Sequence, residues 1–140
     1  MRKRCNRIVR EVRIPITRSL LDQFAQELQF SLMTARLGHF NKDSFDKIGA
    51  ALNVIWGALF HKPPKDASIV TVIEGAMRAM NQCADRGDRS GIWTLSITEQ
   101  ATVSAAADKA EEALQYLDVM ALYKSMQKLR EMREEERKAA

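Results

Sequence analysis

The chain has 140 residues, of which 46% are hydrophobic and 29% are charged, a composition that is ordinary for a globular protein with a single domain. No apolar run approaches the roughly 18 residues that a membrane span needs, and no apolar segment follows the basic N-terminus as in a signal peptide. We therefore expect a cytoplasmic protein that does not cross a membrane.

The net charge of +4 is concentrated at one end of the chain. Residues 1–18 have a net charge of +6, and the rest of the chain has a net charge of −2. Alternation over 12–16 and a proline at position 15 predict an extended basic arm over residues 1–16. This arm is a solvated segment, a binder of nucleic-acid phosphates or a binder of an acidic protein. Its candidate contact residues are Arg2, Lys3, Arg4, Arg7, Arg10 and Arg13.

Apolar residues that recur every three or four positions predict helices along the rest of the chain. The first helix follows a cap at Thr17 and stops at Gly38. The second opens at Asn41 or Asp43, turns Trp56 inward with its other apolar residues, and ends before two prolines. The third is capped by Asp66 and runs to about residue 86.

The fourth helix is predicted from residue 97 to about residue 117, behind a capping box formed by Ser96 and Glu99. Its inner face is rich in alanine, which allows another helix to approach closely. Asp118 caps a fifth helix, or the fourth and fifth helices are continuous. The predicted fold is an all-α bundle of about five helices, with the arm over 1–16, the bundle domain over 17–129 and a charged helical tail over 130–140.

The stretch between the third and fourth helices is rich in turn-forming residues. Gly87 and Gly91 can end a helix, and the β-prone run of residues 92–95 favours an extended backbone. Trp93 would then pack between two helices, and a core position is favoured over an exposed anchor for both Trp93 and Trp56. The charged and aromatic residues of this turn are the candidate partner-binding residues Arg86, Asp88, Arg89 and Trp93.

Motifs for catalysis, metals and cofactors do not emerge from the sequence. His39 and His61 are isolated at helix ends, so neither belongs to a set of ligands with metal-binding spacing. Cys83 lies on an apolar helix face, where a thiol is unreactive, and two free thiols at Cys5 and Cys83 are favoured over a disulfide. No glycine-rich phosphate loop occurs. We therefore expect no catalytic residue, no metal site and no cofactor.

A short heptad-like pattern in the fifth helix provides a third candidate surface. Its spacing of three, four and three residues matches a coiled-coil seam over less than two heptads, which predicts a homo-oligomer contact. The seam residues are Val119, Leu122, Met126 and Leu129.

Residues 41–132 resemble a family of small accessory proteins of phages and prophages in Burkholderia-like and related bacteria. The resemblance is strongest where Arg86-Gly87 is followed by Gly91, Trp93, Leu95 and Glu99, and it continues through Asp108, Ala110, Gln115 and Leu117-Asp118. The chain departs from the pattern before Asn41 and in its Pro63-Pro64 loop. No activity is established for this family, so the resemblance implies a phage or prophage origin but no catalytic residue.

The sequence thus predicts a non-catalytic binding protein of phage origin that inhibits a host protein complex, such as a defence complex, by protein–protein contact. The alternative is a small DNA-binding regulator that uses the basic arm. Both functions act through surfaces rather than through an active site.

Overall fold

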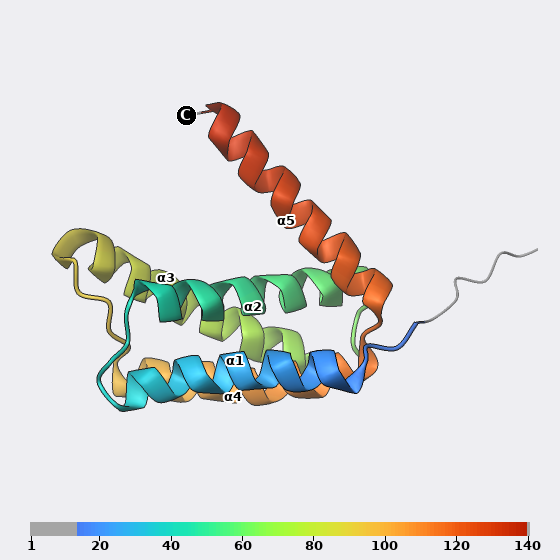
Figure 1. Cartoon of the computed structure of the whole chain (residues 1–140), viewed down its shortest axis with the longest axis horizontal. Helices are drawn as coiled ribbons and strands as arrows, with labels where there is room; N and C mark the ends of the chain where they lie inside the picture. Colours follow the sequence, from blue (N-terminus) through green and yellow to red (C-terminus); the bar gives the residue numbers. More distant parts are fainter. Residues whose placement is uncertain (1–13, 140) are drawn as a thin grey trace, which may run out of the picture.

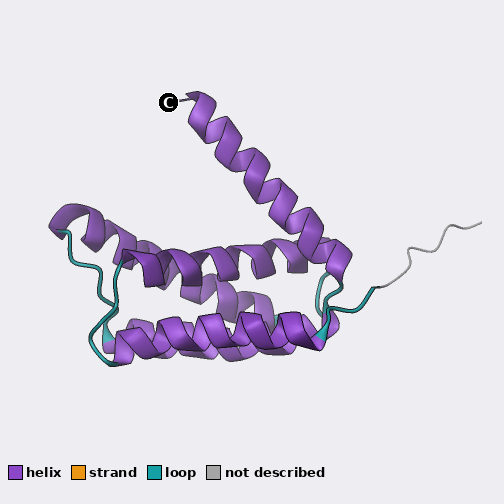
Figure 2. Ribbon diagram, in the orientation of Figure 1, coloured by secondary structure: helices purple, strands orange, loops and turns teal. Residues whose placement is uncertain are grey.

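The computed structural model describes residues 14–139, which form five α-helices and no β-strand (Figures 1 and 2). The fold class predicted from the sequence is therefore confirmed. The helices are α1 (Arg18–Arg36), α2 (Lys42–His61), α3 (Ser68–Ser90), α4 (Ile97–Tyr116) and α5 (Val119–Ala139). Within residues 14–139, no helix combines the length and the apolar character needed to traverse a bilayer.

Side-chain caps fix most of the helix starts. Thr17 caps α1, and the carboxamide oxygen of Asn41, not the carboxylate of Asp43, accepts a backbone N–H at the start of α2. Ser96 and Glu99 form the predicted capping box of α4. Asp118 accepts the backbone N–H of Ala121 at 2.8 Å, so α4 and α5 are separate helices.

The boundaries of α3 differ from the prediction. Asp66 accepts the N–H of Ser68 at 2.9 Å, but the residue that directly precedes the helix is Ala67, which makes no side-chain cap. At the other end, α3 continues past residue 86 to Ser90 and stops at Gly91, whose φ of 73° is left-handed. The prediction that Gly87 takes part in a turn is therefore wrong, because Gly87 lies within the helix.

Helices α1 to α4 form a four-helix bundle (Figure 1), in which α3 and α4 share the most extensive contact. The alanine-rich face of α4 that was predicted from the sequence is buried against the other helices. Small residues in this face let the backbones approach closely where α4 packs against α3, α1 and α2. Its buried apolar residues are Val103, Ala106, Ala107, Ala110, Ala113 and Leu114.

Helix α5 lies outside this bundle and packs on α2, and Figure 1 shows it diverging from α2 toward its C-terminal end. Ala121 and Ser125 are its only buried residues, and Ser125 donates a hydrogen bond to the carbonyl oxygen of Val54 at 2.7 Å. A Cβ atom at Gly57 would collide with the Ser125 hydroxyl, so the glycine permits this close crossing.

Two further predictions concern the arm and Trp56. Ile16 is buried, and Val119 donates its N–H to the carbonyl of Ile14, so the described end of the arm lies along the bundle beside the start of α5. Residues 1–13, with all six basic contact residues predicted in the arm, lie outside the described residues. Trp56 is 38% exposed and donates its indole N–H to Glu74 of α3, so the predicted core position is wrong.

Candidate functional site

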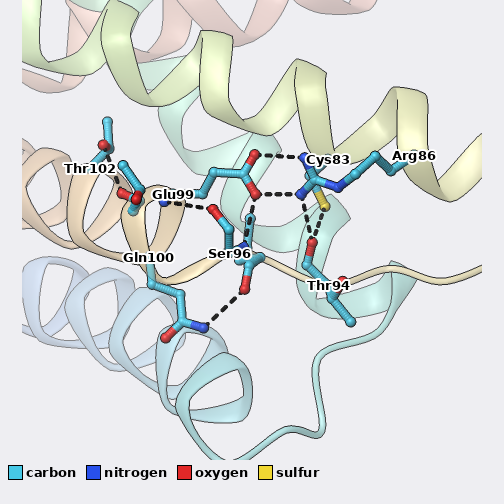
Figure 3. A network of polar contacts seen from close by, with 9 residues as sticks. Cys83, Arg86, Thr94, Ser96, Glu99, Gln100 and Thr102 are labelled. Carbon is cyan, nitrogen blue, oxygen red and sulfur yellow. Dashed lines mark hydrogen bonds and ion pairs between the residues drawn. The ribbon is translucent and has the colours of Figure 1, made fainter.

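The corner where α3 turns into α4 is held by the most connected polar network among the described residues (Figure 3). The guanidinium group of Arg86 donates to both carboxylate oxygens of Glu99, at 2.9 Å for the Nη1–Oε2 pair, and to the carbonyl oxygen of Thr94 at 3.0 Å. Arg86 therefore ties the last turns of α3 to both the connecting loop and α4.

The carboxylate of Glu99 makes two kinds of contact. It accepts the backbone N–H of Ser96 at 2.9 Å as part of the capping box, and it pairs with Arg86 while its own side chain is only 7% exposed. The hydrogen bond from Arg86 lowers the pKa of Glu99 from its ordinary value, although burial opposes this shift. The same hydrogen bond raises the pKa of Arg86. The ionised pair therefore stabilises the corner.

Trp93 packs inside the corner. Its indole lies directly over Gly87, and its ring centroid is 5.0 Å from that of Phe45 in α2. Lys42 lies 5.9 Å from the same ring as a cation–π partner. Trp93 thus joins α2, α3 and the loop. It is half-buried and packs against the core, so the predicted core position is met only in part.

The structure divides the four predicted partner-binding residues into two pairs. Arg86 and Trp93 make contacts that fasten the corner, and Asp88 and Arg89 are exposed in the last turn of α3. Beside them in the sequence, Ile92 is 61% exposed and Ile97 is 87% exposed. We call Asp88, Arg89, Ile92 and Ile97 the corner surface. The two isoleucines were missed because both lie in a segment assigned to structural roles.

Cys83 is buried beside the network and donates its thiol hydrogen to the carbonyl oxygen of Thr94 at 3.3 Å. Burial raises the pKa of Cys83, and the nearby Arg86 only partly opposes this shift. A thiol with a raised pKa has little of the thiolate that attacks substrates or binds metals. Among residues 14–139, no group of three or more histidine, cysteine or acidic side chains could hold a metal ion.

The seam predicted on α5 is divided between the interior and solvent. Leu122 packs against the core and Leu129 is half-buried, whereas Val119 is 37% exposed and Met126 is 52% exposed. Leu122 and Met126 also line an apolar hollow of about 340 Å³ between α1, α2 and α5. The homo-oligomer contact through this seam stays a prediction.

Two further groups of exposed apolar residues lie on α2 and α1. An exposed anchor at Trp56 was considered from the sequence but not favoured, and the α1 group was not identified. On α2, Trp56 and the 77% exposed Phe60 lie with their ring centroids 6.4 Å apart. On α1, Phe30 and Met33 are 65% and 53% exposed, and Leu37, the residue directly after α1, is 66% exposed. The spacing in the sequence could have identified the α1 group, because these residues repeat at steps of three and four on the face of the helix opposite the buried one.

Comparison with protein-family models, with curated proteins and with solved structures finds no match to this chain. The resemblance to phage accessory proteins therefore stays a prediction.

Proposed function

We propose that this chain is a non-catalytic binding protein that acts by contact between the corner surface and another protein. The resemblance to phage and prophage accessory proteins adds the biological setting, in which the partner is a host complex and binding inhibits it. The observation that carries the proposal is the combination of a rigid corner and exposed apolar side chains. Ile97 is 87% exposed in the first turn of α4, directly after the capping box.

Rigidity supports the proposal because it reduces the entropy lost on binding. The loop that presents Ile92 is clamped by Arg86 through the Thr94 carbonyl, and Gln100 also donates to the carbonyl of Leu95 at 3.0 Å. A backbone held in this way loses less conformational freedom when a partner covers it. Apolar anchors close to charged residues match the anatomy of interface hot spots, and Ile92 follows Asp88 and Arg89 closely in the sequence.

The experiment starts with capture of the partner from host lysate treated with nuclease, followed by a quantitative binding assay with the purified partner. We expect Ile97→Ala to weaken binding by about tenfold or more, which corresponds to about 1.4 kcal/mol or more. Phe60→Ala is the matched control, because Phe60 is similarly exposed but lies on α2.

Equal affinities of the Ile97→Ala variant and the unaltered protein would reject the corner surface. Capture that disappears with nuclease, together with duplex binding that weakens steeply with salt, would favour the DNA-binding alternative and its basic arm. Deletion of residues 2–13 would then abolish binding.

A further inference from the structure

Helix α1 carries a second apolar stripe on its outer face. Leu28, Leu32 and Ala35 are buried in the bundle. The opposite face presents an exposed series at steps of three, four, three and four residues, which is the spacing of a coiled-coil seam. We call this series the α1 seam; its residues are Gln23, Gln26, Phe30, Met33 and Leu37.

The α1 seam contains no charged residue. Solvent-facing sides of bundle helices are normally charged, whereas the centres of interfaces are depleted of charge and enriched in phenylalanine and methionine. The nearest charges in the sequence, Asp22, Glu27 and Arg36, lie beside the series and not in it. The composition of the seam is therefore that of an interface centre with charges at its rim.

We infer that the α1 seam is a self-association face, through which two copies of this chain form a two-fold symmetric dimer. A two-fold contact brings the same patch together from both copies, so the patch must complement itself. An uncharged face meets this condition because it brings no like charges together. Glutamine fits as well, because its amide group both donates and accepts hydrogen bonds and can pair with another glutamine.

The area of the seam sets the expected strength of the dimer. Phe30 is 65% exposed and contributes most, since an aromatic side chain buries about 150–250 Å² in full. Three large apolar side chains and two glutamines per copy place the contact among weak interfaces, which bury less than about 1,200 Å² in total. We therefore expect a reversible dimer with a dissociation constant in the micromolar range.

The α5 seam is a poorer candidate for the same role. Leu122 already packs against the core of its own chain, and Ala121 and Ser125 hold α5 on α2. The α1 seam is exposed along its whole length. Its apolar part consists of three residues, and Met33 is the middle one, between Phe30 and Leu37. Met33 therefore meets its own copy near the two-fold axis in two arrangements: in parallel helices, where Phe30 pairs with Phe30, and in antiparallel helices, where Phe30 pairs with Leu37.

The position of Met33 allows a test with opposite charges. Sedimentation equilibrium over a wide concentration range should show the unaltered chain moving from 15.9 kDa toward twice that mass. Met33→Glu and Met33→Lys should each remain monomeric, because like charges would face each other across the axis. An equimolar mixture of the two variants should recover the dimer. Phe60→Glu, which alters an apolar residue on α2 that is even more exposed than Met33, should dimerise like the unaltered chain.

A constant mass of 15.9 kDa at every concentration, dimers of either single variant, or a mixture that stays monomeric would each overturn the inference. Thermal unfolding of each variant checks that it is folded. Gln26→Glu provides a second and milder variant, which should weaken the dimer without touching the apolar part of the seam. The proposed binding of another protein uses the residues of the corner surface and not those of the α1 seam. If that binding is not found, the prediction of a dimer still stands.

Discussion

Replacing Gly87 by alanine tests the packing of the α3–α4 corner. A Cβ atom at this position would lie 2.5–2.8 Å from three carbon atoms of the Trp93 indole. These contacts are far shorter than van der Waals distance, so either the indole or the helix must move. The neighbouring atoms belong to a bulky ring that also packs against Phe45, so the ring cannot yield as a flexible side chain would.

Two opposing effects set the change in the free energy of unfolding caused by Gly87→Ala. Alanine is favoured over glycine within a helix by about 0.8–1.0 kcal/mol. Overpacking of a filled site costs about 1–3 kcal/mol. We therefore expect Gly87→Ala to lower the free energy of unfolding by about 1 kcal/mol, which is about 4 °C in melting temperature for a domain of this size. Gly49→Ala in α2, where no atom lies within 4 Å of the new Cβ, should instead stabilise the protein by up to about 1 kcal/mol.

The assay is urea unfolding followed by circular dichroism, with both alanine variants made in the unaltered chain and in a Trp93→Ala background. Removing the indole removes the collision, so Gly87→Ala should become stabilising there, with a coupling of about 2 kcal/mol between the two positions. If Gly87→Ala stabilises the unaltered chain as much as Gly49→Ala does, Trp93 does not pack on Gly87 and the corner is built differently.

Two further predictions concern the same corner. Because Arg86 lowers the pKa of Glu99, the ionised pair stabilises the fold above the ordinary glutamate value of 4.5 and loses this contribution as the pH falls below it. The urea midpoint of Glu99→Gln should therefore be lower than that of the unaltered chain at neutral pH, and the difference between the two midpoints should narrow below about pH 4.5. A difference that does not change with pH would contradict the ion pair. In a Cys5→Ser variant, burial and a raised pKa should make Cys83 react with a thiol reagent much more slowly than after unfolding in urea, and equal rates would show that the thiol is accessible.

The parts of the fold that sequence reasoning predicted well depend on local contacts. The Ser96–Glu99 capping box and the Asp118 cap join residues only three positions apart, so the sequence contains the whole interaction. The alanine face of α4 was predicted for a similar reason, because helical spacing alone shows which small residues share a face.

The errors arise where a distant residue decides the outcome. Gly87 has the residue type of a helix stop, but the glycine is needed for contact with Trp93, which lies beyond the end of the helix. Trp56 was placed inward with the apolar face of α2. Its ring instead lies at the edge of that face, where Glu74 of α3 accepts its N–H at 3.1 Å. Neither partner can be inferred from spacing within one helix.

The candidate surfaces follow from how the interior is filled. Close crossings at α3–α4 and α2–α5 use alanine, glycine and serine, which leave little space between the helices for large side chains. Large apolar residues therefore also occur outside, and exposure of a single one is ordinary. Met132, for example, is 47% exposed within a strongly charged segment. The α1 seam differs because three such residues repeat without an intervening charge, and the corner surface differs because a fixed backbone presents its isoleucines. The regular spacing of the α1 seam and the rigid backbone of the corner surface, rather than exposure alone, are the reasons for proposing these two surfaces as binding sites.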